Sequence, residues 1–404
     1  MRKIYAALSL VMLFTALSVQ KSFAEANYVY HEATTNNPGC GVGSPNYRSV
    51  LTPNSSQSLQ IAWKLEYQFF TDQARVYYTT DGSNPAGAFG AGTGTTQVIA
   101  GTYNCTFGSP VVDVVVATIP AQRPGTVVKY IVSGWHSGGG AEIFGNGAGP
   151  GCGPGCGTIT NNSSLATVFS YTVANAGNVD VFSAGGSGSP MTSYITLAAA
   201  VVAINNGAAH TGAITAYVLN GIRQSIPDTG INLRATGTLA NPIIIRETIS
   251  GGINPNIVAY QTGTATAGTT GSPLDGIFRI IGSDYVTIDG LDFSDTIVNT
   301  TAATQMEFGI GFFKNSPTDG CHNNTITNCT VTLNRNNVTA GLGDFADGSC
   351  GIWVSNSLAS NNASVIITST SGANSDNKFY TNIIQNCNTG IFLRGFVATT
   401  PTTN

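Results

Sequence analysis

The feature that most constrains this chain is a loose internal repeat in its C-terminal half. The dipeptide Gly-Ile begins at Gly309, Gly351 and Gly390, at separations of 42 and 39 residues. Short apolar runs punctuated by Gly, Asn and Asp fill the intervals, a pattern typical of β-solenoids. We interpret each interval as two coils of ~20 residues, with apolar side chains facing inward and coils stacked ~4.8 Å apart.

Asparagine and threonine recur within this repeat in segments with turn-like composition. Residues 324–329 read Asn-Thr-Ile-Thr-Asn-Cys, and residues 381–387 read Thr-Asn-Ile-Ile-Gln-Asn-Cys. Side chains at equivalent turns of stacked repeats lie one above another. We therefore expect them to form hydrogen-bonded ladders along the stack.

The composition excludes several classes of protein. Charged residues make up 9% of the chain, against about 25% in an average soluble protein. The formal net charge is −4, so the chain has no basic surface for a phosphate backbone. A coiled coil, a charge-driven disordered chain and a nucleic-acid-binding protein are excluded. Uncharged polar residues favour extended β-structure, and the fold class we expect is all-β.

The first 24 residues have the organisation of a secretory signal peptide. Arg2 and Lys3 are followed by an apolar run over residues 4–19 and by a small-x-small cleavage site that ends at Ala24. The alternative is an uncleaved anchor, but the run is shorter than the ~20 residues of a spanning helix. We expect a mature chain that is secreted or held at the cell surface, with no membrane span.

Export makes the cysteine count informative. An even number of cysteines in an oxidising compartment predicts disulfides, and we expect pairing within each half of the chain. The eight are Cys40, Cys105, Cys152, Cys156, Cys321, Cys329, Cys350 and Cys387. Cys152 and Cys156 are candidates for a bridge that closes a Gly-rich loop. A zinc site is the alternative there, although no His lies at the usual spacing.

Residues 25–176 predict an antiparallel β-sandwich. Apolar and polar residues alternate over 59–69, which is typical of a strand with one buried face. Further strands are predicted at 75–80, 111–118, 126–132 and 167–173. No segment of this half carries a helical period, so two packed sheets are the economical arrangement.

Residues 77–85 read Tyr-Tyr-Thr-Thr-Asp-Gly-Ser-Asn-Pro. This segment resembles the hairpin of immunoglobulin-like modules attached to bacterial chitobiases and other secreted carbohydrate enzymes. The resemblance implies an immunoglobulin-like fold and the role of a spacer or accessory binding module. Trp135 and His136 precede a Gly-rich stretch at 138–157 and are candidate glycan contacts. The alternative is a core tryptophan beside a surface loop.

A change in composition marks the boundary between the two halves. Residues 177–192 include a Gly- and Ser-rich stretch and are expected to form a linker. One helix is predicted directly afterwards, at residues 197–204, with Thr196 as its N-cap. The remaining domain, residues 193–404, would then hold the repeats.

This second domain resembles right-handed parallel β-helix proteins of the pectate-lyase-like superfold. Residues 382–393 look like their Asn-x-Ile…Asn-x-x-Gly-Ile-x-Leu repeat. Residues 196–215 and 286–290 are similar to the β-helix start of large adhesin-like proteins found with type IX secretion in Gram-negative bacteria. The resemblance implies a short helix over the first coil. The C-terminal end has no capping segment, which indicates either a fragment or self-association through that end.

Few residues suggest a catalytic or metal-binding site. The densest acidic group holds Asp284, Asp289, Asp292 and Asp295, for which turn roles are favoured over Ca²⁺ binding or catalysis. Asp344 and Asp347 lie on a Gly-rich insertion and are the candidate metal ligands, with Ca²⁺ as the ion that they would suit.

Basic residues and histidines add no catalytic pattern. Arginines of the early coils could form a stacked row for an acidic polymer, although the acidic net charge favours scattered, solvated side chains. These arginines are Arg223, Arg234, Arg246 and Arg279. No Ser-His-Asp arrangement, phosphate loop or metalloprotease helix is present in the sequence, and no catalytic residue or cofactor is assigned.

We therefore expect a secreted or cell-surface structural and adhesive protein that binds glycans or neighbouring subunits through a rigid β-helix. The alternative is a polysaccharide lyase or glycoside hydrolase with an accessory sandwich domain. That alternative follows from fold resemblance alone, and one fold hosts many functions. A third reading, ice or mineral binding by Thr-rich faces, lacks regular Thr-x-Thr rows.

Overall fold

The computed structural model divides the chain into two compact units, Met1–Ala174 and Asn175–Asn404. The residues that it describes are 28–36, 40–41, 46–66, 73–108, 111–145, 159–227, 229–259, 276–295, 299–300, 305–335, 348–360 and 364–395. The expected signal peptide lies outside these residues. Among the described residues, no helix is both long and apolar enough to cross a membrane.

The first unit consists of two antiparallel sheets over a shared core. One sheet has the order β1(Val29–Tyr30), β2(Leu59–Glu66), β8(Val112–Ile119), β7(Thr102–Phe107). The other has the order β10(Ile143–Phe144), β9(Val127–Trp135), β3(Gln73–Thr79), β6(Gln97–Ala100), with β11(Phe169–Thr172) also paired to β9. The five strands predicted from alternation are confirmed as β2, β3, β8, β9 and β11.

A buried chain of hydrogen bonds runs through this core. Arg48 Nε donates to the Tyr130 hydroxyl at 2.7 Å, and His31 Nε2 lies 2.7 Å from that hydroxyl. His31 Nδ1 lies 2.8 Å from the Ala62 carbonyl. Because arginine can only donate, the Tyr130 proton points at His31 Nε2, and a neutral His31 donates from Nδ1. Burial, with a smaller contribution from Arg48, lowers the pKa of His31 to about 3.

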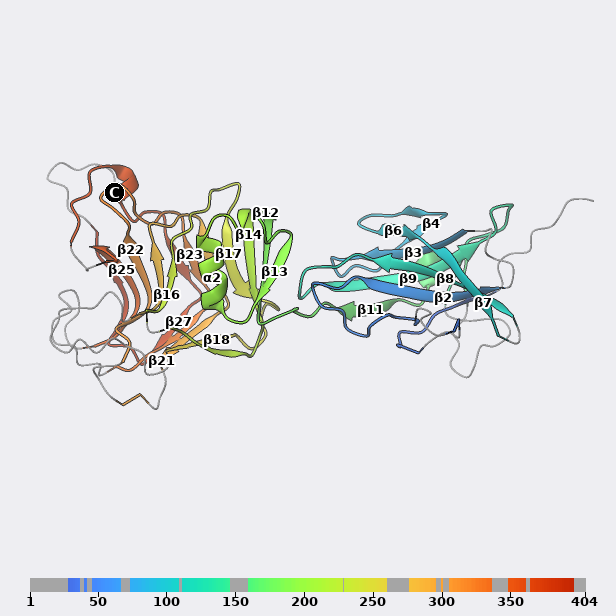
Figure 1. Cartoon of the computed structure of the whole chain (residues 1–404), viewed down its shortest axis with the longest axis horizontal. Helices are drawn as coiled ribbons and strands as arrows, with labels where there is room; N and C mark the ends of the chain where they lie inside the picture. The colour runs from blue at the N-terminus through green and yellow to red at the C-terminus, as the bar shows by residue number, and fades with distance from the viewer. Residues whose placement is uncertain are drawn as a thin grey trace, which may run out of the picture. The chain divides into compact units, whose positions relative to one another are not determined.

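The second unit is a stack of five coils, each with three strands (Figure 1). Sheet 1 contains β13(Met191–Tyr194), β12(Val179–Gly185), β14(Thr211–Val218), β17(Ile243–Glu247), β20(Val286–Asp289), β23(Thr325–Thr327) and β26(Lys378–Tyr380). Sheet 2 contains β15(Arg223–Ser225), β18(Asn256–Ala259), β21(Asp292–Asp295), β24(Thr330–Thr332) and β27(Ile383–Gln385). Sheet 3 contains β16(Ile231–Leu233), β19(Gly276–Ile281), β22(Phe308–Lys314), β25(Cys350–Leu358) and β28(Thr389–Leu393).

Pairing between coils is parallel throughout, so the predicted parallel β-helix architecture is confirmed at the level of parallel stacked sheets. The predicted coil length is wrong. Ile310 pairs with Ile352, and Ile352 pairs with Ile391, in adjacent strands of sheet 3. Each repeat of about 40 residues is therefore one coil rather than two.

The linker and the cysteine pairing also differ from the sequence analysis. Residues 177–192, expected to form a linker, include β12 and the first residues of β13, which pair with each other and extend sheet 1. The expected pairing of the last four cysteines is not present: Cys321, Cys329, Cys350 and Cys387 are free thiols. In the first unit, Cys40 and Cys105 form a disulfide.

The predicted helix is α2(Leu197–Asn205), capped by Thr196. It packs Leu197, Val201 and Ile204 into the core of the second unit. Both helix ends also bond to the first coil: Leu197 N donates to the Gln224 side chain at 2.6 Å, and the Asn205 amide donates to the Asn232 carbonyl at 2.7 Å. The helix thus covers the first coil and excludes water from its apolar interior.

The first unit should lose stability at mildly acidic pH because His31 is buried in its neutral form. In the unfolded chain His31 has an ordinary pKa. The stabilisation is therefore complete above about pH 6.5 and is lost as the pH falls toward the pKa that His31 has in the folded state. We expect a loss of roughly 2–3 kcal/mol at pH 4.5 from this group. Urea unfolding of the full chain at pH 7.5 and 4.5 measures it.

The matched control is His31→Gln, which removes the titrating group. Other groups titrate equally in both proteins, so the variant should show a smaller pH dependence. Equal pH dependence of the two proteins would contradict the assignment of this effect to His31.

Candidate functional site

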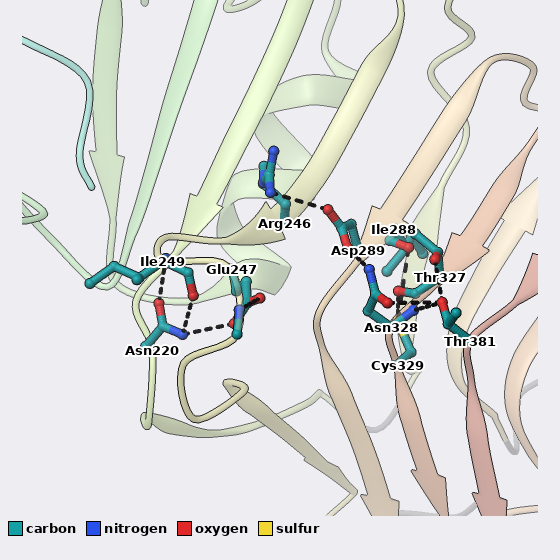
Figure 2. A network of polar contacts seen from close by, with 11 residues as sticks. Asn220, Arg246, Glu247, Ile249, Ile288, Asp289, Thr327, Asn328, Cys329 and Thr381 are labelled. Carbon is teal, nitrogen blue, oxygen red and sulfur yellow. Dashed lines mark hydrogen bonds and ion pairs between the residues drawn. The ribbon is translucent and has the colours of Figure 1, made fainter. Parts of the chain in front are cut away.

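Polar side chains link successive coils at the corner where sheet 1 leads into sheet 2, which we call the first corner (Figure 2). Arg246 Nη2 lies 3.2 Å from Asp289 Oδ2. Asn328 Nδ2 donates to Asp289 Oδ1 at 2.8 Å, and Thr381 Oγ1 donates to Asn328 Oδ1 at 2.8 Å. These contacts join the second, third, fourth and fifth coils, and confirm the predicted ladder of polar side chains.

The first corner has a left-handed residue at the same place in the third, fourth and fifth coils. Gly290 (φ 72°), Asn328 (φ 55°) and Thr381 (φ 55°) follow the strands of sheet 1 directly. Glycine and asparagine adopt this conformation readily, but a β-branched threonine does not. Thr381 is held there because its hydroxyl also lies 2.8 Å from the Thr327 hydroxyl.

Asparagine amides link the coils at the corner between sheets 3 and 1, which we call the third corner. Asn324 is fully buried. Its Oδ1 accepts from the Val286 N–H at 2.9 Å, and its Nδ2 donates to the Ser283 carbonyl at 2.9 Å. Asn377 repeats this arrangement one coil later, with bonds to the Asn324 N–H and the Cys321 carbonyl. Each amide therefore satisfies two backbone groups of the preceding coil.

The outward residues of sheet 1 beside the first corner form one register row. Tyr217 pairs with Arg246, Arg246 with Asp289, Asp289 with Thr327, and Thr327 with Tyr380. We call these five residues the tyrosine row. Tyr380 is 52% exposed, and the side chains of Arg246 and Asp289 are 34% and 17% exposed. Tyr217, at the other end of the row, is partly buried and contacts Phe182 edge to face at 5.8 Å. The row thus has one exposed and one partly buried aromatic ring at its ends and a fixed ion pair between them.

The predicted acidic group does not form one site. Asp289 belongs to the tyrosine row, while Asp292 accepts from the Asn254 amide at 2.9 Å in sheet 2. Asp284 lies at the third corner and accepts from the His322 N–H at 2.7 Å; burial raises its pKa. Asp295 is buried and accepts from the Met306 N–H at 3.0 Å. Each carboxylate thus bonds within its own part of the stack, which agrees with the favoured turn roles.

The arginines do not form a stacked row. Arg223 lies in sheet 2, Arg246 in sheet 1, and Arg279 in sheet 3. Arg279 is buried and donates to the Thr229 carbonyl at 2.6 Å, whereas Arg234 follows β16 and lies 3.5 Å from the Asn315 amide oxygen. Among them, only Arg246 belongs to the tyrosine row.

Several candidate residues cannot be placed. Asp344 and Asp347, the candidate metal ligands, and Cys152 and Cys156, the candidate bridge, lie outside the described residues. Within the described part of the chain, no group of three or more His, Cys, Asp or Glu side chains is positioned to hold a metal ion.

Trp135 and His136, the candidate glycan contacts, lie at the end of β9. Trp135 is only 8% exposed, so its ring cannot act alone as an open platform. Nε2 of its neighbour His136 lies 2.5 Å from a carboxylate oxygen of Glu66. An exposed aromatic residue that the sequence analysis missed, Phe89, contacts Trp135 edge to face at 5.6 Å.

A pocket of about 260 Å³ lies beside the last coil. Its lining includes Lys314 and Arg394 as positive groups and Asp376 as the one carboxylate. Lys314 is buried, donates to the Gly372 carbonyl, and has a pKa lowered by burial.

The asparagine ladder predicts a large and specific loss of stability. Asn324→Ala leaves the Val286 N–H and the Ser283 carbonyl buried without their amide partner, at about 1–3 kcal/mol for each group. We expect the second unit to lose roughly 2–5 kcal/mol in urea unfolding. Gln385→Ala is the control, because its bond to Thr332 is also between coils but is exposed. A loss below about 0.5 kcal/mol in both variants would contradict this role for Asn324.

The comparisons with known proteins add little to this geometry. No family model matches the chain, and no curated protein matches it. Among solved structures, the chain is similar to the catalytic domain of a GH87 alpha-1,3-glucanase in complex with nigerose. The identity is 13%, the TM-score is 0.16, and the match covers 91% of this chain and 67% of that chain. A TM-score this low carries no argument about fold or function.

Proposed function

We propose that this chain is an exported, carbohydrate-binding structural protein. Its second unit would be a rigid β-helix of the right-handed kind that binds polysaccharide or cell-surface glycan along sheet 1. The tyrosine row carries this proposal, because it combines the exposed ring of Tyr380 and the partly buried ring of Tyr217 with charged groups that are already held in place.

The chemistry of the tyrosine row suits a sugar chain. Pyranose rings present C–H groups that pack on aromatic faces, and their hydroxyls bond to carboxylate and guanidinium groups. Tyr217 and Tyr380 are four strands apart, which is ~19 Å along the stack. Arg246 and Asp289 lie between them and are oriented by their mutual contact, so little conformational entropy is lost when a ligand binds.

A structural and adhesive role is favoured over lyase or hydrolase activity by the partners of the carboxylates. Asp289, Asp292 and Asp295 accept hydrogen bonds from asparagine amides of neighbouring segments. These side chains support the stack: Asp289 lies in sheet 1, whereas Asp292 and Asp295 begin and end the same strand of sheet 2. Binding along a rigid stack would gain strength from several weak contacts made at once.

The proposal also covers the first unit, the coil of β26, β27 and β28, and the candidate Ca²⁺ ligands. The first unit would be an immunoglobulin-like accessory module. Self-association through the coil of β26, β27 and β28 stays a prediction. Ca²⁺ binding at Asp344 and Asp347 stays a prediction.

The tyrosine row makes a direct prediction about binding. Tyr380→Ala and Tyr217→Ala should each weaken polysaccharide binding by about tenfold, since aromatic anchors commonly contribute more than 1 kcal/mol. Affinity electrophoresis through gels that contain soluble glucans, xylans, mannans and pectins measures this. Leu239→Ala, which removes an exposed apolar side chain on a turn, should bind as the unaltered chain does. Equal retardation of all four proteins would contradict the proposal.

Export makes a separate prediction. Expressed with its leader in a Gram-negative host, the full chain should leave the cytoplasm and begin at Glu25 when its N-terminus is sequenced. Replacing Ala24 by a bulky residue such as Leu should block cleavage at that bond. A cytoplasmic product that still carries residue 2 would contradict export.

A further inference from the structure

Phe89 occupies an unusual position for a bulky side chain. It lies in the two-residue turn between β4(Gly87–Ala88) and β5(Ala91–Gly92). Phe89 has φ 49° and Gly90 has φ 81°, so both turn residues are left-handed. Turns of this kind normally take Asn, Asp or Gly. The Phe89 side chain is nevertheless 58% exposed, so core packing does not explain why a phenylalanine stands there.

Buried polar groups beneath the turn hold this conformation. The Phe89 N–H donates to a carboxylate oxygen of Glu142, and the Gly90 N–H donates to the Tyr77 hydroxyl at 2.8 Å. Tyr77 in turn donates to Glu142 at 2.8 Å, and Ser133 donates to it at 2.6 Å. Tyr77 and Glu142 are both buried. A left-handed bulky residue that is fixed by several bonds is typical of a functional position.

The Phe89 ring has a firm aromatic support. Its centroid lies 5.6 Å from that of Trp135, with the rings nearly perpendicular at 87°. The Arg75 guanidinium lies over the same tryptophan at 5.2 Å and donates to the Gln73 side chain at 2.7 Å. Trp135 is thereby enclosed between Arg75 and Phe89, and Phe89 is the ring that faces solvent.

This aromatic pair lies at the C-terminal end of β9. Trp135 is the last residue of β9, whereas β11, the final strand before the chain leaves the unit, ends beside Val127 at the other end of β9. The two strand ends are ~26 Å apart. At this end of β9, His136 Nε2 lies 2.5 Å from a carboxylate oxygen of Glu66.

We propose that Phe89, backed by Trp135, is a stacking platform for a neutral pyranose chain. The exposed ring supplies the apolar surface on which a sugar ring packs, and the Arg75 guanidinium over Trp135 supplies a polar contact for its hydroxyls. Arg75 and the Glu142 carboxylate beneath the turn carry opposite charges, which suits an uncharged sugar better than a polyanion. This site lies on the first unit and is separate from the tyrosine row.

The test titrates the full chain with neutral hexasaccharides of glucose, N-acetylglucosamine, xylose and mannose. Tryptophan fluorescence reports binding, since Trp135 contacts Phe89. Phe89→Asn keeps a residue that tolerates the left-handed turn, so the unfolding midpoint should stay unchanged while the affinity falls at least tenfold. Phe89→Tyr should retain affinity within about twofold. Tyr103→Ala, which removes an exposed aromatic ring elsewhere on the unit, is the matched control.

Each outcome supports or overturns the proposal. A loss in Phe89→Asn that Phe89→Tyr restores supports it, whether or not Tyr380→Ala also weakens binding. Binding that is unchanged in Phe89→Asn but lost in Tyr380→Ala overturns this platform and leaves the tyrosine row in place. No binding of any hexasaccharide with a Kd below about 1 mM also overturns it. If Phe89→Asn instead abolishes binding of a partner protein and of no sugar, the platform is a protein contact and the proposal is wrong.

Discussion

The second unit depends on side-chain amides that take over backbone hydrogen bonding where the chain turns between sheets. Within a strand, parallel pairing satisfies the backbone groups, but at a corner these groups lose their ladder partners. Asn324 and Asn377 replace those partners from the next coil. Because the interior beside them is apolar and closely packed, an unpaired amide there would be costly. The coils can therefore stack only in the register that brings each asparagine to its corner.

The same requirement explains how the stack begins. An open first coil would expose apolar side chains and backbone groups to solvent. Helix α2 covers it with Leu197, Val201 and Ile204, and its two ends bond to the coil through Gln224 and Asn205. The outer faces are then free to vary, because the inward residues and the corners hold the stack together. The tyrosine row on sheet 1 is one such outer face.

Local patterns in the sequence predict much of this fold. The alternation of apolar and polar residues predicts β2, and the Gly-Ile spacing predicts the strands of sheet 3. Both patterns arise because the apolar side chains of these strands must face the core. The coil length could not be predicted, because loops of very different length join the strands. One connection runs only from Asp289 to Asp292, whereas another runs from Thr332 to Cys350. The Phe89 turn could not be predicted either. Its conformation depends on Glu142, 53 residues away, and local preference would place Asn or Gly there.

The central claim is that this chain binds polysaccharide without cleaving it. The most direct measurement incubates the purified full chain with plant, algal and microbial polysaccharides, with and without Ca²⁺, and follows both retention of the protein and release of reducing ends or unsaturated products. The account predicts retention on at least one polymer and no product from any. Product release that rises with protein concentration would contradict it and show a hydrolase or lyase.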